Sequence, residues 1–200
     1  MNPQLLLIFT KNPELGKVKT RLAKSIGDQK ALEVYLHLLN HTRDITVKLE
    51  AIDKAVFYSK FVDQADLWEA SHFQKQVQQG EGLGERMSNA FVWGFEQGYQ
   101  DIVIVGSDNI EITQTIIEEA FTALKTNDFV IGPAKDGGYY LLGMKALYPE
   151  VFENKTWSTN TVFPDTMQNL KANSDQIHLL PLLSDVDTVE DLASFPVKFV

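Results

Sequence analysis

The sequence predicts an α/β three-layer sandwich with a mostly parallel sheet, formed by a single domain over residues 1–200. Apolar β-branched runs without polar alternation, such as residues 102–105, are typical of strands buried on both faces of a parallel sheet. These runs alternate with amphipathic helical segments along most of the chain, as they do in βαβ units. The chain has 200 residues, of which 44% are hydrophobic and 22% are charged, so it can bury one substantial core.

The composition narrows the expected partners and chemistry. A formal net charge of -9 and an isoelectric point near 4.9 repel nucleic acid and anionic membranes, so we expect neither as a partner. The absence of cysteine excludes disulfides, thiolate catalysis and sulfur-ligated metals. The apolar run at residues 5–9 is too short for a signal peptide and has no basic residues before it, so we expect a cytoplasmic protein. The sequence leaves the oligomeric state open.

Three strands are predicted in the first part of the chain, at residues 4–10, 54–59 and 73–78. The helices predicted between them are a short one from Thr20, a long one with Asp28 as its N-cap, and a helical turn at residues 64–70. The long helix keeps one apolar face as far as Leu49, so we expect it to pack on the sheet.

The second part of the chain continues this alternation. Its predicted strands are residues 102–105, 129–132, 139–143 and 177–180. Its predicted helices follow the glycine cluster at residues 80–84, begin at Thr113, restart near Pro164 and end the chain after an N-cap at Thr188. The Asp136-Gly137 pair is a hairpin-type turn signal between two of the strands.

The end of the predicted central strand is the first candidate site. Gly106 lets the chain turn, and Ser107, Asp108, Asn109 and Glu111 place oxygen atoms at the carboxyl edge of the sheet, where open α/β folds bind ligands. A carboxylate at this edge can hold a divalent cation, and the cation can hold phosphates. The alternative is that Asp108 and Asn109 only turn the chain into the next helix.

A basic loop after the first strand is the second candidate site, and its residues are Lys11, Gly16, Lys17, Lys19, Thr20 and Arg21. Backbone N–H groups at a helix start and basic side chains together bind a diphosphate or triphosphate. The string GKVKT is not a Walker A motif, because Val follows Gly-Lys and the upstream glycine is missing. The alternative is a solvated surface loop.

The string QQGEGLGER, residues 78–86, places three alternating glycines before a helix. Its spacing does not fit a dinucleotide fingerprint, and the string does not follow the first strand. We interpret Gly80 as part of a loop that lets backbone approach a nucleotide base, with Arg86 anchoring the loop. A flexible turn is the alternative interpretation.

The string GPAKDGGYYLLG is the third candidate, on the side of the acceptor. Asp136 is a candidate metal ligand or base for an acceptor hydroxyl, with Gly137, Gly138 and Tyr139 beside it. The alternative is a hairpin turn. Trp157 is a candidate for stacking on a sugar or base, although a partly buried tryptophan of the core is the more common situation.

Taken in order, the strings KNPELGKVKTRL, QGEGLGERM, GSDNIEI, GPAKDGGYYLLG, WSTNTVF and DVDTVEDL resemble the DUF2064 family of bacterial glycosyltransferase-A-like (GT-A) proteins. They span nearly the whole chain. The resemblance implies a nucleotide-diphospho-sugar transferase fold, a nucleotide-activated donor and a divalent cation, Mg²⁺ or Mn²⁺. The family is related to nucleotidyltransferases of cofactor biosynthesis, and some members are labelled arsenosugar-biosynthesis glycosyltransferases.

The resemblance also implies roles for single residues. By position, Asp108 and Asp187 match metal ligands, and Lys11, Lys19 and Arg21 match a phosphate-binding loop. The string GSDNIEI departs from the relatives, which more often have Cys-Pro-Asp after the aspartate. We expect Lys19 and Arg21 to offset negative charge as the bond breaks, and Asp136 to activate the acceptor hydroxyl.

Three functions remain open from the sequence. The first is a metal-dependent glycosyltransferase that moves a sugar from a nucleotide sugar to a small-molecule acceptor, favoured by the family labelling and by the acidic pair Asp185 and Asp187. The second is a nucleotidyltransferase that releases pyrophosphate from a nucleoside triphosphate, favoured by the basic loop. The third is a non-catalytic nucleotide-binding protein.

Overall fold

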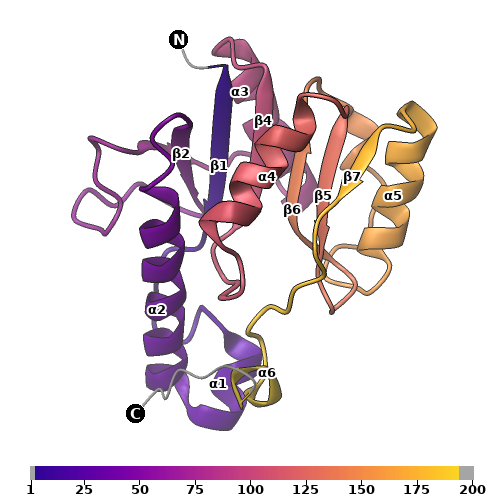
Figure 1. The fold of residues 1–200 in the computed structure, drawn as a ribbon. Helices are drawn as coiled ribbons and strands as arrows, with labels where there is room; N and C mark the ends of the chain where they lie inside the picture. The colour runs from indigo at the N-terminus through magenta and orange to yellow at the C-terminus, as the bar shows by residue number, and fades with distance from the viewer. Residues whose placement is uncertain (1–2, 194–200) are drawn as a thin grey trace.

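A seven-stranded sheet runs through the computed structural model, which describes residues 3–193 (Figure 1). Its strands are β1 (Gln4–Thr10), β2 (Asp53–Tyr58), β3 (Gln74–Val77), β4 (Asp101–Gly106), β5 (Phe129–Pro133), β6 (Tyr139–Met144) and β7 (Ile177–Leu179). Their order is β3-β2-β1-β4-β6-β5-β7, and β6 runs antiparallel to both of its neighbours while the other pairs are parallel. The predicted mostly parallel sheet and the central position of β4 are therefore confirmed.

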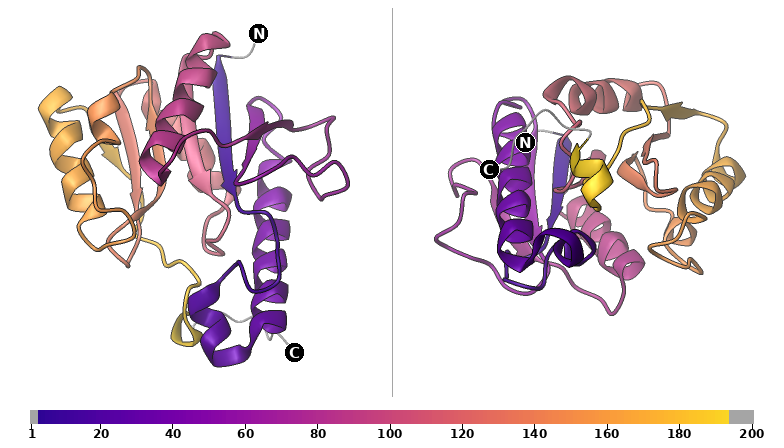
Figure 2. Two further views of the ribbon diagram at one scale, coloured as in Figure 1. Left: turned by 180° about the vertical axis from the view of Figure 1, so that it is seen from behind. Right: turned by 90° about the horizontal axis from the view of Figure 1, so that it is seen from below.

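Helices cover both faces of the sheet and form its outer layers. They are α1 (Thr20–Ile26), α2 (Asp28–Thr46), α3 (Leu83–Glu96), α4 (Gln114–Leu124), α5 (Val162–Asn173) and α6 (Val189–Ala193), with a 3-10 helix, η1 (Pro149–Val151). Buried side chains of α2 and α4 share one core cluster, and those of α3 and α5 share another. The view from behind in Figure 2 shows α3 and α5 on their face of the sheet. The predicted three-layer α/β architecture is confirmed.

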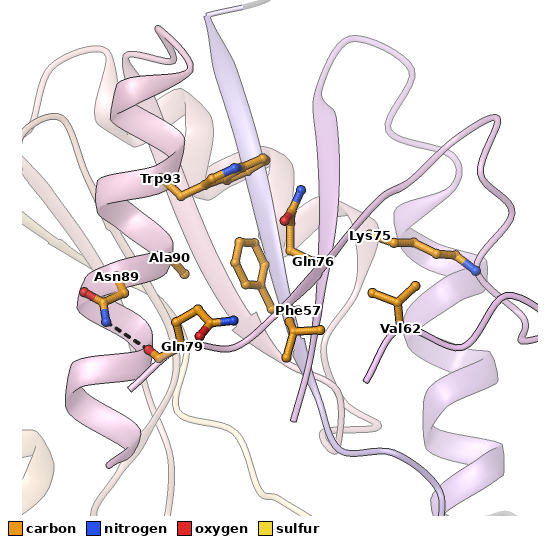
Figure 3. A pocket seen from close by; sticks show the side chains of 9 residues that line it. Phe57, Val62, Lys75, Gln76, Gln79, Asn89, Ala90 and Trp93 are labelled. Atoms are coloured by element: carbon orange, nitrogen blue, oxygen red, sulfur yellow. Dashed lines mark hydrogen bonds between the residues drawn. The ribbon is translucent and has the colours of Figure 1, made fainter. Parts of the chain in front are cut away.

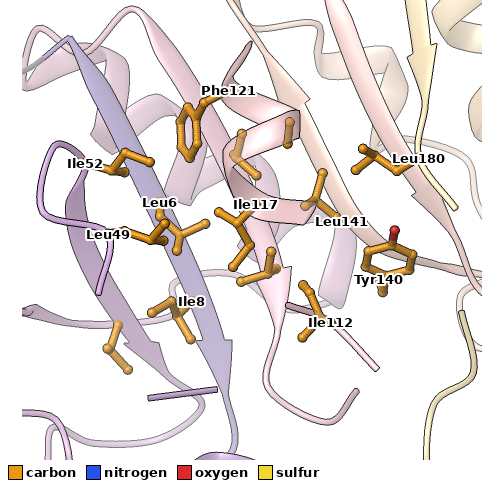
Figure 4. Packing of buried hydrophobic residues seen from close by; sticks show 14 of the residues in the cluster. Leu6, Ile8, Leu49, Ile52, Ile112, Ile117, Phe121, Tyr140, Leu141 and Leu180 are labelled. Carbon is orange, nitrogen blue, oxygen red and sulfur yellow. The ribbon is translucent and has the colours of Figure 1, made fainter. Parts of the chain in front are cut away.

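The strand sequences lack polar alternation because both faces are buried. In β1, Leu6 and Ile8 pack towards α2 and α4 (Figure 4), whereas Leu5 and Leu7 belong to the cluster under α3 and α5. All four side chains are fully buried, and each stabilises the fold by about 1.5–3 kcal/mol relative to an exposed position. The buried sheet is thus a rigid base for the loops at its edges.

A small third cluster joins helices α1 and α2 to the segment before α6. Leu22 of α1, Val34 and Leu38 of α2, and Val186 just before α6 pack on one another. Figure 1 shows α1 and α6 side by side beyond the carboxyl ends of the parallel strands. This cluster holds the basic loop and the segment before α6 at the same edge of the sheet.

The structure corrects the predicted helical turn at residues 64–70, where no helix forms. Asp63 and Asp66 accept hydrogen bonds from the backbone N–H groups of Ala65 and Trp68, at 2.9 and 3.0 Å. Such local bonds to aspartate side chains compete with helical hydrogen bonds, so the segment turns instead.

Smaller corrections concern helix ends. Gly27 is the N-cap of α2, with φ at 85°, and Asp28 is the first helical residue; the helix ends at Thr46 rather than near Leu49. α5 continues past Pro164 without a break, because the proline lies in the first turn, where its missing N–H costs nothing. None of the described helices is long and apolar enough to cross a membrane.

Candidate functional site

Three segments meet beyond the carboxyl ends of β1 and β4. They are the basic loop, the loop after β4 and the segment before α6, and Lys19 of the basic loop contacts the other two. Lys19 Nζ donates to Asp108 Oδ2 at 3.1 Å and to Asp187 Oδ1 at 3.0 Å. Arg21 Nη1 lies 3.8 Å from Asp187 Oδ2. The two carboxylates that the sequence analysis paired therefore lie on either side of one ammonium group.

Lys19 is held in an unusual position. Its backbone is left-handed, with φ at 46°, and its side chain is only 3% exposed. Burial lowers the pKa of Lys19, but the charges of Asp108 and Asp187 outweigh it, so the net pKa lies above the ordinary value. The Lys19 charge in turn lowers the pKa of Asp108. Both groups are therefore charged at neutral pH.

Asn109 and Glu111 fix the loop after β4 to the segment before α6. Asn109 Oδ1 accepts from the N–H groups of Glu111 and Ile112, and its Nδ2 donates to Asp185 Oδ1 at 2.9 Å. Glu111 Oε2 accepts from the N–H of Ser184 at 2.6 Å. Asn109 therefore shapes the turn and Asp108 contacts the basic loop, whereas the cation-binding role of Asp108 stays a prediction.

Asp185 is a second perturbed carboxyl of the site. Burial, followed by the nearby charge of Asp108, raises its pKa from 3.8 to about 7. Asp136 also contributes to this rise, so its charge acts on the same edge of the sheet. Asp185 is thus partly protonated at neutral pH.

This shift leads to a prediction for Asp185→Asn, which keeps an oxygen for Asn109 Nδ2. Between pH 4 and 7 the folded protein binds more protons than the unfolded chain, so this group makes the wild type lose stability as pH rises. The variant lacks this pH-dependent loss of stability. The melting temperature of the variant minus that of the wild type should therefore become more positive from pH 5 to pH 8. Thermal unfolding with EDTA measures it, and a pH-independent difference would contradict the assignment.

The basic side chains line one small cavity, and among them Lys19 is buried whereas Lys11, Lys17 and Arg21 are exposed. This cavity, of about 310 Å³, is lined by Lys11, Lys17, Lys19, Arg21, Asp108 and Asp187, among others. Gly16 lies apart from it, with φ at 71° and its α-carbon against the carboxylate of Asp28. The phosphate-binding role of the loop therefore stays a prediction.

A larger cavity of about 510 Å³ adjoins the small one. Its lining includes Lys11, Gln78, Arg86, Ser107, Asp108 and Tyr139. Four residues line both cavities, and they are Lys11, Tyr35, Asp108 and Ser158. A ligand that extends from one cavity to the other would pass all four.

The glycine loop forms one wall of the larger cavity. Arg86 Nε donates to the Gly80 carbonyl at 2.9 Å, and Gly80 has φ at 132°. A side chain at Gly80 would contact Glu85 at 2.9 Å, so only glycine fits there without a shift. Arg86 therefore fixes the loop and also lines the cavity, while the predicted contact with a base stays a prediction.

Among the residues predicted on the acceptor side, Asp136 and Gly137 lie in the turn between β5 and β6, whereas Tyr139 lines the larger cavity. Asp136 is exposed, and its Oδ1 accepts from the N–H of Gly138 at 2.9 Å in the turn between β5 and β6. Gly137 packs against Asn160. Tyr139 lines the larger cavity, and burial raises its pKa.

Trp157 packs against neighbouring residues and lines neither of the two cavities. Its ring lies against Gly84 and makes an edge contact with Tyr139 at 6.5 Å between centroids. Among the described residues, its neighbour Ser158 lines the two cavities and Trp157 lines neither. The stacking role of Trp157 stays a prediction without a contact that supports it.

Sequence reasoning missed several cavity residues. Tyr35 of α2 exchanges hydrogen bonds with both the N–H and the carbonyl of Lys11. Gln78 Nε2 donates to the carbonyls of Thr10 and Phe57. Both look like ordinary helix or loop residues in the sequence, and only the paired strands place them beside the basic loop.

The donor set fits a magnesium or manganese ion. Such ions are commonly held by one or two carboxylates together with substrate phosphates and water, and Asp108 and Asp187 supply two carboxylates. Within residues 3–193 no group of three or more histidine or acidic residues is arranged to hold a metal by itself. A cation at this edge would therefore depend on phosphate oxygens from a substrate.

A third cavity lies away from this site. It has a volume of about 330 Å³, and Figure 3 shows Phe57, Gln76 and Trp93 around it, between β2, β3 and α3. Asn89 Nδ2 donates to the Gln79 carbonyl at its rim. None of the predicted site residues is among the described residues that line it.

Comparison with known proteins identifies a matching family model and solved structures of similar fold. Residues 42–159 match the DUF2064 family model, described as an uncharacterized protein conserved in bacteria. A solved structure from Desulfovibrio desulfuricans G20, named "putative nucleotide-diphospho-sugar transferase", is 35% identical with a TM-score of 0.88, covering 96% of this chain and 85% of that one. A search of the curated proteins found no match.

More distant structures share the fold alone. A cytidylyltransferase from Leptospira borgpetersenii is 12% identical with a TM-score of 0.59, covering 100% of this chain and 90% of that one. Rv0371c from Mycobacterium tuberculosis H37Rv, solved as a complex with manganese, is 11% identical with a TM-score of 0.55, covering 96% and 97%. These proteins have the same overall architecture as the present chain.

Proposed function

Since the chain belongs to the DUF2064 family, we propose that it is a cation-dependent transferase that moves a sugar from a nucleotide sugar to a small-molecule acceptor. The observation that carries this proposal is the contact of Lys19 with both Asp108 and Asp187 at the junction of the two cavities. This junction lies at the carboxyl edge of the sheet, where open α/β folds bind ligands.

The two cavities suit the two parts of such a donor. The small cavity has four basic side chains, which suits a diphosphate. The larger cavity has both apolar and polar walls and falls in the size range of small-molecule sites, which suits a nucleoside or a sugar. A nucleotide sugar would thus extend across Lys11 and Asp108.

In the proposed mechanism, Asp108 and Asp187 would hold a Mg²⁺ or Mn²⁺ ion, which stabilises negative charge on the donor phosphates. Lys11, Lys19 and Arg21 orient the diphosphate and offset the charge that develops on it as the bond to the sugar breaks. The acceptor oxygen forms its bond to the sugar as the bond between sugar and diphosphate breaks and the nucleoside diphosphate leaves. Asp136, whose Oδ1 accepts from the N–H of Gly138, takes the proton of the acceptor hydroxyl.

A nucleotidyltransferase is the second candidate. Such an enzyme breaks a bond within a triphosphate and releases pyrophosphate. The observation that favours it is the convergence of four basic side chains on the small cavity, since a triphosphate carries more negative charge than a diphosphate. The likeness in fold to a cytidylyltransferase is compatible with it. A nucleotide-binding protein without activity would bind the same ligands without turnover.

A product assay separates the three functions. The protein is incubated with a panel of nucleoside triphosphates and nucleotide sugars, Mg²⁺ or Mn²⁺, and a mixture of hydroxylated and phosphorylated small acceptors. We expect release of a nucleoside diphosphate from one nucleotide sugar, and no release when EDTA replaces the cation. Pyrophosphate release would support the second function, and saturable binding without any product would support the third.

A further inference from the structure

The segment from Trp157 to Thr161 contributes a residue that the proposed function has not yet used. Ser158 lines both cavities together with Lys11, Tyr35 and Asp108. Those three residues belong to the loop after β1, to helix α2 and to the loop after β4. Ser158 is the one member of the set that comes from the chain leading into α5.

Ser158 has a strained backbone. Its φ is 63°, in the left-handed region that L residues other than Gly, Asn and Asp seldom adopt. Just before this segment, Asn154 also has a positive φ, at 53°, but asparagine tolerates this conformation. Strain of this kind persists when the surroundings enforce it, and it is concentrated at ligand-binding positions.

The chain on both sides of Ser158 is held by contacts of its neighbours. On one side, Gly84 of α3 lies so close to the Trp157 ring that a β-carbon at position 84 would be 2.8 Å from it. On the other side, a β-carbon at Gly137 would be 2.4 Å from the α-carbon of Asn160. The N–H of Phe163 donates to the Gly137 carbonyl at 2.8 Å. Helix α3 and the β5–β6 turn thus hold the segment from both sides.

We propose that Ser158 binds the donor directly, donating a hydrogen bond from its hydroxyl to a phosphate oxygen where the donor passes from the larger cavity to the small one. This inference rests on the proposed function, because it requires a diphosphate at the junction. Lys11 and Asp108, which line the same junction, are the residues through which that function places the phosphates. The Ser158 hydroxyl has a single O–H and donates it to one phosphate oxygen. It therefore orients the phosphate, whereas the other groups of the site act through their charge.

A held backbone at Ser158 lowers the entropic cost of binding the donor, compared with a residue in a flexible loop. A backbone that is already held at the junction loses little conformational freedom when the donor binds. A hydrogen bond to a charged group contributes about 1.5–3 kcal/mol, which corresponds to about a 10- to 100-fold change in affinity or rate. The contact is therefore large enough to measure.

The test compares Ser158→Ala and Ser158→Gly with wild type, with Asn154→Gly as the matched control for a left-handed residue outside both cavities. Binding of ADP, CDP, GDP and UDP with Mn²⁺ is measured by calorimetry, turnover of the active nucleotide sugar gives kcat and KM, and thermal unfolding gives Tm. We expect both Ser158 variants to lose about 10- to 100-fold in diphosphate affinity or in kcat/KM. Ser158→Gly should also melt at a higher temperature than Ser158→Ala, because glycine releases the strain.

Asn154→Gly should bind the diphosphate and turn over the donor like wild type. If both Ser158 variants stay within threefold of wild type while Asp108→Ala loses binding, the Ser158 contact is wrong and the proposed function stands. If wild type itself binds none of the four diphosphates with Mn²⁺, the proposed function and this inference are both overturned. A Ser158→Ala variant that lowers Tm but leaves affinity and kcat/KM unchanged would also overturn the inference, because its role would then be structural.

Discussion

Replacement of Asp108 by alanine should weaken binding of a nucleotide donor with Mn²⁺ by at least about 100-fold while leaving the fold intact. Changes to groups that only support metal ligands already cost about 10- to 100-fold in affinity, and Asp108 is proposed as a ligand itself. The Asp108 side chain is 46% exposed, and Lys19 keeps its contact with Asp187 at 3.0 Å. We expect the free energy of unfolding to fall by about 1–3 kcal/mol, because the buried Lys19 ammonium loses one of its two carboxylate partners.

Asp101→Asn is the matched control for this variant. Asp101 begins β4 at the opposite edge of the sheet, where it accepts a hydrogen bond from Gln4 Nε2 that an asparagine oxygen can also accept. Calorimetric titration of both variants with the nucleotide and Mn²⁺, together with thermal unfolding, makes the comparison. Unchanged donor affinity in Asp108→Ala would remove Asp108 from the site.

Replacement of Gly137 by alanine should destabilise the protein more than any other single methyl addition in the turn between β5 and β6. Gly137 has φ at 90°, and the added β-carbon would be 2.4 Å from the α-carbon of Asn160, which is backbone and cannot rotate away. Backbone strain and overpacking together cost about 2–5 kcal/mol, and each 1 kcal/mol lowers the Tm of a chain of this size by roughly 2–4 °C. Turnover should fall as well, because the substitution displaces the segment that carries Ser158.

Gly27→Ala separates the two causes of this destabilisation. Gly27 has a similar φ, 85°, but nothing lies within 4 Å of an added β-carbon. Strain alone should then lower its Tm, whereas Gly137→Ala adds the clash and should melt several degrees lower still. Equal losses of Tm in the two variants would show that the contact between Gly137 and Asn160 is not tight.

The sequence predicts the sheet well because its strands are buried on both faces. Unbroken runs such as residues 102–105 have few alternatives, and caps such as Thr113, whose hydroxyl accepts from the N–H of Ile116 at 3.3 Å, mark helix starts directly. The sequence fails at residues 64–70, because hydrogen bonds that Asp63 and Asp66 accept from nearby backbone N–H groups outweigh the helical pattern. Local competition of this kind leaves little trace in hydrophobic periodicity.

The candidate site was predictable where residue type alone carries chemistry. Asp108, Asp187 and the basic residues of the loop are charged, and the resemblance paired them before any geometry was known. Tyr35, Gln78 and Ser158 reach the cavities only because α2, β3 and the segment before α5 are packed against the same edge. For Ser158, the signal that identifies it is its φ of 63°, which a sequence does not reveal.

The central claim is that a nucleotide sugar gives up its sugar at the junction of the two cavities in the presence of a divalent cation. The most direct test of this claim is ³¹P NMR of the reaction products. With the active donor, Mn²⁺ removed by chelation before the spectrum and an acceptor present, we expect the two resonances of a nucleoside diphosphate in place of those of the nucleotide sugar. Resonances of pyrophosphate from a nucleoside triphosphate, or no change in any donor spectrum over many protein equivalents, would contradict the claim.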